Sequence, residues 1–352
     1  MRFSTRYLIG GTLTVYVITT AIMLVSFFKK HSCDNIYPYD ALSVDRLDYS
    51  LFEFVSISQV LRSQIEETLK SELPPAVDDT LVILDDLKAL NNVMHQMERH
   101  VDERAARLVL SQPVINYHNF SYIHNPTYYC TESQINVILI IPSATTNFEK
   151  RMAARRGNKR DYVLNVENRA KLLFFLGSPS RGGNIHTVQK NIDQEMKEFG
   201  DIVQEDFEDS YKNNRLKSVS MLRWVSTYCS TAKFVLRTDD DIEVNVSALI
   251  SVLHRTSHSL NNFIIGMKRT KDPPRRDNSK YYISEQEYPY PVFPPYLLGG
   301  LLGYPVSTAR LLYEAAMRTQ PIWLEDVYIT GICAYKLHIP ILEDPEFVFK
   351  HE

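Results

Sequence analysis

The sequence predicts an α/β fold with a mainly parallel central sheet. Three short apolar runs have the length of buried strands, at residues 135–143, 171–177 and 234–236, and residues 201–203 are expected to form a further short strand. Runs of this kind are typical of parallel strands that are covered on both faces. Helical segments at 184–199 and 216–228 separate them, and this alternation indicates strand–helix–strand units. The sequence has no G-x-G-x-x-G fingerprint, so an ordinary dinucleotide-binding fold is not expected.

The strand at residues 234–236 leads almost directly into three adjacent carboxylates, Asp239, Asp240 and Asp241. Like charges this close repel one another, so a cation is expected to offset them. Mg²⁺ and Mn²⁺ prefer oxygen ligands and bridge carboxylates to the phosphates of a substrate. Open α/β sheets also bind ligands at the carboxyl ends of their strands. The sequence therefore predicts a Mn²⁺ or Mg²⁺ site here, and the alternative is a solvated acidic turn.

This segment resembles the DxD motif of nucleotide-sugar-dependent glycosyltransferases. Its surroundings are similar to the β-1,3-galactosyltransferase and β-1,3-N-acetylglucosaminyltransferase family. Residues 209–217 resemble the family pattern D-S-Y-x-N-L-T-x-K, and residues 325–331 match E-D-V-Y-x-x-G. Residues 223–229 and 294–304 resemble two further family segments, in the same order along the chain. The resemblance extends from about residue 136 to residue 352.

The resemblance implies a Rossmann-like GT-A domain that transfers a sugar with inversion and requires a metal ion. The expected donor is a UDP-sugar that carries galactose, N-acetylglucosamine or a related hexosamine. The expected acceptor is a glycan on protein or lipid, which is extended in β-1,3 linkage. The resemblance also implies a single-pass type II protein of the Golgi membrane with a lumenal catalytic domain.

On the donor side, the resemblance implies that Asp241 binds the metal directly. Asp239 would meet the ribose or the water shell of the metal, and Asp240 belongs to the same donor-binding group. Arg151, Arg155 and Lys217 would bind the diphosphate, since guanidinium groups suit phosphate oxygens. The alternatives are a solvated basic helix face for the arginines and a surface role for Lys217. His351 is a candidate third metal ligand.

On the acceptor side, inversion needs a base that takes the proton of the attacking hydroxyl. Asp326 is the candidate base and Glu325 the second choice, because neighbouring carboxylates raise each other's pKa toward neutrality. The alternative is an acidic pair that stabilises a helix N-terminus. Tyr296, Gly299 and Tyr304 would form the wall that contacts the acceptor sugar.

Two departures from the family pattern affect this prediction. Asn158 lies where the family has Trp, which puts the local packing of the first helix in question. Gly303 and Tyr304 come two residues later than the equivalent family pair, and Leu297 and Leu298 replace small polar residues. Acceptor specificity is therefore the property that transfers least from the family to this chain.

The N-terminal third reads as a membrane anchor followed by a stem. Residues 7–28 carry no charge and are long enough to span a bilayer, after a short cytoplasmic tail at 1–6. A lumenal stem at 29–134 then precedes the catalytic domain at 135–352. Helical patterns at 51–73 and 81–110 indicate either a coiled coil that forms a homodimer or a helix packed on its own domain.

The charge and cysteine content exclude some classes of protein. The net charge of −3 and a pI near 6.4 do not suggest a nucleic-acid-binding protein. The four cysteines are too far apart for a compact zinc motif, and they allow one or two disulfides whose pairing the sequence does not give. Two sequons are present: Asn119 is the expected glycan site, and Asn245 is expected to cap a helix.

Two other functions remain to be weighed. Phosphoryl transfer through an aspartyl nucleophile would need an Asp-x-Asp pattern after the first strand, where this chain has Ile141, Pro142 and Ser143. A catalytically inactive membrane-anchored scaffold or lectin-like protein is the alternative outside the enzymes. Both carboxylate centres are intact in the sequence, which favours the enzyme.

Overall fold

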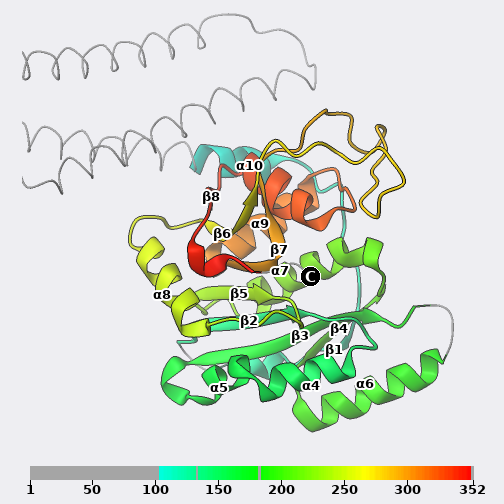
Figure 1. Cartoon of the computed structure of the whole chain (residues 1–352), viewed down its shortest axis with the longest axis vertical. Helices are drawn as coiled ribbons and strands as arrows, with labels where there is room; N and C mark the ends of the chain where they lie inside the picture. The colour runs from blue at the N-terminus through cyan, green and yellow to red at the C-terminus, as the bar shows by residue number, and fades with distance from the viewer. Residues whose placement is uncertain (1–102, 132–133, 181–183, 350–352) are drawn as a thin grey trace, which may run out of the picture. The chain divides into compact units, whose positions relative to one another are not determined.

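A computed structural model describes residues 103–131, 134–180 and 184–349 of the chain. These residues form an α/β domain around an eight-stranded sheet with the strand order β1-β4-β3-β2-β5-β7-β6-β8 (Figure 1). The predicted class of fold is therefore confirmed.

The strands that the sequence predicted form the parallel centre of the sheet. They are β2 (Val137–Pro142), β3 (Ala170–Ser178), β4 (Ile202–Glu208) and β5 (Phe234–Thr238). β2 lies between β3 and β5 and is parallel to both. Because both faces of this region are covered, nearly every residue of β2 and β5 is buried.

The remaining strand pairs are mostly antiparallel, and the sequence did not predict them. β7 (Tyr296–Pro305) runs antiparallel to β5 and to β6 (Ile264–Arg269), and β8 (Ile341–Leu342) pairs with the outer edge of β6. At the opposite edge, β1 (Tyr122–His124) is antiparallel to β4. The glycines of β7 weaken the strand signal in the sequence, but in a strand such glycines permit close packing.

Helices cover both faces of the sheet. The longer ones are α4 (Phe148–Arg156), α5 (Asn158–Leu164), α6 (Ile185–Phe199), α7 (Asn214–Tyr228), α8 (Val246–Ser257) and α9 (Val306–Arg318). Short helical segments are η1 (Thr127–Cys130), η2 (Val166–Asn168), η3 (Tyr211–Asn213), η4 (Val327–Cys333), α10 (Ala334–Lys336) and η5 (Pro345–Phe347). In Figure 1, α4, α5 and α6 lie together along one side of the sheet.

Alternation along the strands divides the core into two clusters. Ile138 and Ile140 of β2 pack with α7 and α9, whereas Leu139 and Ile141 of the same strand pack in the cluster that includes α8. Successive side chains of a strand point to opposite faces, so one apolar strand contributes to both layers. This arrangement fixes the carboxyl ends of β2 and β5 side by side.

The sequence suggested that the domain begins at residue 135, but in the structure it begins earlier. Residues 103–111 are helical, and Val109 is buried in the core. β1 belongs to the central sheet, and the side chain of Asn125 accepts a hydrogen bond of 2.8 Å from Trp224 Nε1 on α7. The last part of the expected stem is thus packed on the α/β domain.

The remaining N-terminal predictions lie outside the described residues. These are the tail at 1–6, the anchor at 7–28 and most of the stem, including any coiled coil that would form a dimer. Within the part of the chain that the structure describes, no helix has both the length and the apolar character of a membrane span.

A disulfide joins Cys130, at the end of η1, to Cys229, just after α7. The sequence allowed a disulfide but did not give this pairing. Cys333 is a free, buried cysteine, and burial raises its pKa to about 12. Its thiol is therefore unreactive at neutral pH.

Removing this disulfide should destabilise the domain. The bond closes a loop of 99 residues, for which the chain-entropy model gives about 4.7 kcal/mol of stabilisation. We expect the double variant Cys130→Ser/Cys229→Ser to show this loss in urea unfolding followed by circular dichroism. A reductant should lower wild-type stability to the level of the variant and leave the variant unchanged. Equal stability of oxidised and reduced wild type would contradict the assignment.

Candidate active site

Two carboxylate centres that are far apart in the sequence meet at one end of β5. Asp239, Asp240 and Asp241 follow this strand, while Glu325 and Asp326 precede η4. Arg237, near the end of β5, lies between the two centres. Its Nη2 is 2.6 Å from Glu325 Oε1 and 3.9 Å from Asp239 Oδ1. The two centres therefore form one site, with a buried cation at its base.

The neighbouring strand β7 positions both centres. The backbone N–H of Asp239 donates to the carbonyl of Gly300 at 3.0 Å. At Gly299, a Cβ atom would lie 2.3 Å from Asp326 Oδ1 and 2.6 Å from Arg237 Nη1. A side chain at this position would displace Asp326 or Arg237, so Gly299 is needed here for close approach.

The three aspartates have three different environments. Asp240 points inward and accepts hydrogen bonds from Ser143 Oγ at 2.7 Å and Asn147 Nδ2 at 2.9 Å. Asp241 points outward with 58% of its side chain exposed, and Lys150 Nζ lies 2.8 Å from it. This lysine lowers the pKa of Asp241. Asp239 is partly exposed, and burial raises its pKa to about 6 although Arg237 opposes the shift.

This arrangement fits the predicted metal site in part. Asp239 and Asp241 are the two outer members of the triplet and keep accessible oxygens, which are the ligands that Mn²⁺ and Mg²⁺ prefer. Asp240 is held by Ser143 and Asn147 and instead fixes the loop to the end of β2. Within the described ranges, no three His, Cys, Asp or Glu side chains are grouped as a metal site. Such ions often take only one or two carboxylates and complete their shell with substrate phosphates. His351, the expected third ligand, lies outside the described residues.

Glu325 and Asp326 differ in how firmly they are held. Glu325 accepts hydrogen bonds from Ser218 Oγ and from Arg237, so both of its oxygens are engaged. Burial and the adjacent Glu325 raise the pKa of Asp326 to about 7, while Arg237 lowers it. A carboxylate that titrates near neutral pH suits a general base. The geometry therefore favours Asp326 over Glu325 for that role.

The backbone after these carboxylates is irregular. η4 is a π-helix, a rare geometry that occurs frequently at functional sites. The hydroxyl of Thr330 in η4 donates to the carbonyl of Asp326 at 2.7 Å and accepts from the N–H of Leu297 at 2.8 Å. These bonds tie the segment that carries Asp326 to β7.

Arg151 and Arg155 lie in a buried ion cluster and do not present guanidinium groups to a ligand. Arg151 makes two bonds to Glu195, at 2.9 and 2.7 Å, and Arg155 binds Asp201 twice, at 2.8 and 2.7 Å, and Glu195 at 2.6 Å. Burial alone would raise the pKa of Glu195, but its bonds to the two arginines hold it below the usual range. The prediction that they bind the diphosphate is thus corrected: their charge is neutralised by partners that lie 40 to 46 residues away.

Arg151 nevertheless acts on the site through Ser143. Its Nη1 donates to Ser143 Oγ at 3.2 Å and to the carbonyl of Ala144 at 2.6 Å. Ser143 Oγ in turn donates to Asp240. The arginine therefore orders the loop after β2, which carries one of the partners of the aspartate triplet.

Lys217 is buried at the edge of the site. Its Nζ donates to the carbonyl of Ser143 and to Asp209 Oδ1, each at 2.8 Å. Two of its three N–H bonds are thus used to join α7 to the loop after β2. A contact between its remaining N–H and the donor stays a prediction.

The predicted acceptor wall is not exposed. Tyr296 and Tyr304 are only 8% and 4% exposed, and Tyr296 OH donates to Asp272 Oδ2 at 2.6 Å. Both belong to the core cluster that packs against α7 and α9. Because β7 is a buried strand and not a loop, these rings fill the core and do not face a sugar. This prediction was wrong for both tyrosines, whereas Gly299 does lie at the site.

Sequence reasoning also missed three cations. Arg237 and Lys150 contact the aspartates as described above, and Lys159 Nζ donates to the carbonyl of Ile242 at 2.5 Å. Burial lowers the pKa of Lys159. The signal for Arg237 was its place two residues before a triplet that needs positive charge. Its partner Glu325 is 88 residues further along the chain, so the pairing itself was not visible.

The remaining departures have structural answers. Asn158, at the position of the family tryptophan, donates from Nδ2 to the carbonyl of Val244 at 2.7 Å and thus ties α5 to the segment after the aspartates. Asn245 caps α8 as expected, since its Oδ1 accepts from the N–H of Ala248 at 3.2 Å. Asn119 is exposed.

A domain with a nucleotide-sugar motif at the end of a parallel strand, next to a second carboxylate pair, is the arrangement expected of a glycosyltransferase. Comparison with known proteins places the chain more narrowly. The family model described as Galactosyltransferase matches residues 150–345, which is more than half of the chain. The chain belongs to this family.

Named relatives support the same assignment. A lactosylceramide 1,3-N-acetyl-β-D-glucosaminyltransferase of Homo sapiens is 32% identical over 62% of this chain and 59% of its own length. Lactosylceramide 1,3-N-acetyl-β-D-glucosaminyltransferase A of Xenopus laevis is 30% identical over 62% of this chain and 59% of its own length. Beta-1,3-galactosyltransferase 1 of Mus musculus is 31% identical over 66% of this chain and 70% of its own. The match thus spans about three fifths of the first of these relatives.

Proposed function

We propose that this chain is an inverting, metal-dependent β-1,3-glycosyltransferase. It would transfer galactose, N-acetylglucosamine or a related hexosamine from a UDP-sugar to a glycan on protein or lipid. The observation that carries the proposal is the Arg237 bridge, which brings the DxD carboxylates and the Glu325–Asp326 pair into one site. The printed names of the relatives support the linkage and the two candidate sugars.

Each residue of the site has a distinct part in this reaction. Asp239 and Asp241 would hold Mn²⁺ or Mg²⁺, which neutralises the charge that develops on the departing nucleoside diphosphate. Asp326 accepts the proton of the acceptor hydroxyl as that oxygen attacks the anomeric carbon from the side opposite the leaving group. Burial and the charge of Glu325 raise the pKa of Asp326 to about 7, against the opposing charge of Arg237.

No observation favours the inactive scaffold. A decayed site is free to lose its charge pairing. Here Arg237 still donates to Glu325, and Gly299 still leaves the space that Arg237 occupies. In an inactive scaffold, an apolar residue could replace the buried Arg237, because a buried ion pair contributes little net stability.

The product of the reaction tests the proposal. A form that begins at residue 30 would be incubated with UDP-galactose or UDP-N-acetylglucosamine, Mn²⁺ and a terminal galactoside, and the product analysed by NMR. We expect a β-configured sugar on the 3-hydroxyl. An α-configured product would contradict the inverting mechanism, and transfer to another hydroxyl would contradict the linkage.

We also propose that the chain is anchored in the Golgi membrane with its domain in the lumen. The apolar run at 7–28 supports an anchor, and the Cys130–Cys229 disulfide fits an oxidising compartment. A homodimer through the stem remains part of this proposal and would be tested by crosslinking of the full chain. Crosslinking that is unchanged when residues 51–102 are deleted would contradict it.

Exposed Asn119 should carry a glycan if the domain is lumenal. We expect cleavage by peptide N-glycosidase to increase the electrophoretic mobility of the full chain expressed in cells. Ser121→Ala should remove this shift because it destroys the sequon, and Ser121→Thr should retain it because threonine also completes one. A mobility that the enzyme does not change in the wild type would contradict the proposed topology.

A further inference from the structure

Three aromatic side chains from separate parts of the chain lie together beside the carboxylates. Tyr211 belongs to η3, Tyr281 to the long loop between β6 and β7, and Trp323 comes two residues before Glu325. The ring centroids of Tyr211 and Trp323 are 6.1 Å apart. Burial raises the pKa of Tyr211, and so do a hydrogen bond with Tyr281 and the charges of Asp326 and Glu325. The Tyr211 phenol is thus close to both Tyr281 and the candidate base.

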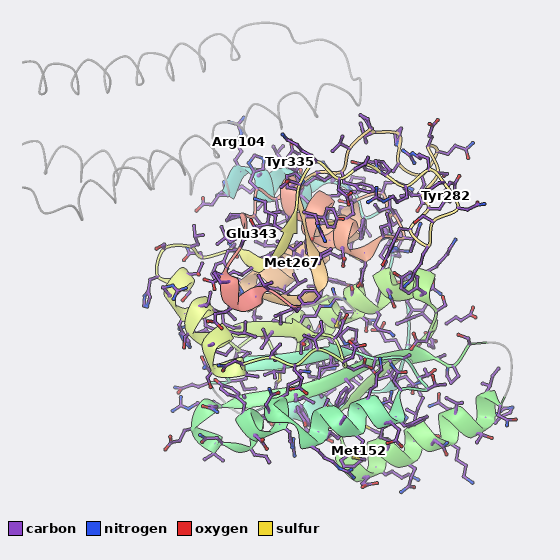
Figure 2. The ribbon with its side chains drawn as sticks, viewed as in Figure 1. Arg104, Met152, Met267, Tyr282, Tyr335 and Glu343 are labelled. Carbon is purple, nitrogen blue, oxygen red and sulfur yellow. A yellow bond between two sulfur atoms is a disulfide. The ribbon has the colours of Figure 1, made fainter. Side chains whose placement is uncertain are left out.

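These rings differ from the tyrosines of β7 because they reach the surface. Tyr211 is 45% and Tyr281 47% exposed, whereas Tyr296 and Tyr304 are buried in the core. The loop that carries Tyr281 is the yellow-to-orange segment of Figure 1, and Figure 2 shows the adjacent Tyr282 on its outer part. Exposed aromatic rings beside a catalytic base are candidates for substrate contact, since Tyr and Trp combine an apolar body with a polar tip.

Trp323 is held rigidly. Its indole Nε1 donates to the carbonyl of Tyr282, and its backbone N–H donates to Glu287 Oε1, both at 3.1 Å. Both bonds run to the loop between β6 and β7. An aromatic ring fixed in advance loses little conformational freedom when a ligand packs on it, which favours binding.

Two lysines line this aromatic cluster. Lys280 Nζ lies 4.1 Å from the ring centroid of Tyr211 and 5.6 Å from that of Tyr281, and Lys212 Nζ lies 5.6 Å from that of Trp323. Within the described ranges, neither lysine is recorded in an ion pair. An ammonium group over an exposed ring makes only a weak interaction, whereas its hydrogen bond to an anion is stronger.

We propose that Tyr211, Tyr281 and Trp323 form the acceptor subsite and that Lys212 and Lys280 select acidic acceptors. The C–H face of the terminal sugar packs on the negatively charged faces of the rings, so that its 3-hydroxyl faces Asp326. A carboxylate or sulfate elsewhere on the acceptor glycan binds the two ammonium groups. This inference rests on the proposed function and replaces the buried wall of Tyr296 and Tyr304 with an exposed one.

Acceptor binding without any donor tests the aromatic part. Saturation-transfer NMR on the detergent-solubilised full chain would use a terminal galactoside as the probe. Trp323→Ala should weaken its binding at least about tenfold, and Trp323→Phe, which keeps a ring, should restore most of it. Tyr117→Ala, at an exposed tyrosine outside the cluster, is the matched control. If Trp323→Ala binds the galactoside with an affinity within twofold of the wild type, the aromatic acceptor subsite would be overturned.

The charged part is tested with three matched acceptors: a neutral galactoside, its sulfated form and its carboxylate-bearing form. The wild type should bind at least one anionic form about fivefold more tightly than the neutral one, and the form preferred identifies the anion. Lys212→Gln/Lys280→Gln should remove this preference, so that the variant binds the three acceptors with equal affinity. Equal binding of all three acceptors by the wild type would overturn the selection of acidic acceptors.

These results separate this inference from the proposed function. Because the NMR experiment contains no UDP-sugar, loss of the aromatic contact has no bearing on donor binding. Suppose that the wild type binds UDP with Mn²⁺ but that Trp323→Ala binds the acceptor as tightly as the wild type does. This result would contradict only the aromatic acceptor subsite. In active samples, Trp323→Ala should raise the KM for acceptor and leave the KM for UDP-sugar within twofold.

Discussion

Replacing Asp326 with asparagine should lower kcat by roughly 10³-fold at pH 8, as expected when a positioned general base is removed. Asparagine keeps the shape of the side chain and its contact with Gly299 but accepts no proton from the acceptor. Transfer would be measured with UDP-galactose and UDP-N-acetylglucosamine at saturating acceptor. Glu325→Gln is the informative comparison, because Glu325 is held by Ser218 and Arg237 and should matter less directly.

The same variant should be more stable than the wild type at alkaline pH. The pKa of Asp326 is raised from its ordinary value to about 7, so the folded state favours the protonated form. The stability that this protonation gives is present at low pH and is lost as the pH rises through 7. Asparagine avoids this loss, so its Tm should exceed that of the wild type at pH 8 and match it more nearly at pH 5.

The dependence of the wild-type kcat on pH should show the ionisation of Asp326. Because Asp326 must be ionised to act, kcat should fall as the pH drops below about 7, with the slope of a single ionisation. A variant with near wild-type kcat, or a lower Tm at pH 8, would contradict the role of Asp326 as a half-buried base.

Asp241→Asn should abolish metal-dependent transfer while the protein still folds. The carboxylate is the most exposed of the triplet, and a metal ion supplies several kcal/mol of transition-state stabilisation, so a loss of at least about 100-fold is expected. The Lys150–Asp241 pair is exposed on both sides, and such pairs contribute at most about 1 kcal/mol. The Tm should therefore change little.

Lys150→Met is the matched control for this variant. It removes the same ion pair but no candidate metal ligand, so its transfer activity should stay dependent on Mn²⁺. If Asp241→Asn keeps its activity, or if Lys150→Met loses activity as severely, the loss would belong to the ion pair and not to the metal.

The parallel centre of the sheet was predictable because its strands are buried on both faces. Such strands appear in the sequence as apolar runs, and these fall in β2, β3 and β5, whereas β4 is apolar only at its first two residues. β7 was missed because glycines at 299, 300 and 303 weaken the strand signal. This omission also affected the predicted acceptor wall, because a buried strand places Tyr296 and Tyr304 in the core.

The identity of the carboxylates was readable from local patterns, but their charge partners were not. Asp239, Asp241 and Asp326 stand in short motifs whose residue types indicate metal and proton chemistry. Arg151 and Arg155 also looked like ligands for phosphate, yet they are neutralised by Glu195 of α6 and by Asp201, the residue just before β4. Pairings of this kind depend on the fold, and a sequence without its fold shows only the unpaired charge.

Titration of UDP into the chain by calorimetry, with and without Mn²⁺, tests the central claim most directly. A soluble form that begins near residue 30 would be used, first with UDP and then with UDP-galactose and UDP-N-acetylglucosamine. We predict binding that requires Mn²⁺, is lost in Asp241→Asn and is kept in Asp326→Asn, because the base lies on the acceptor side. A folded sample that binds no uridine nucleotide under either condition would contradict the account.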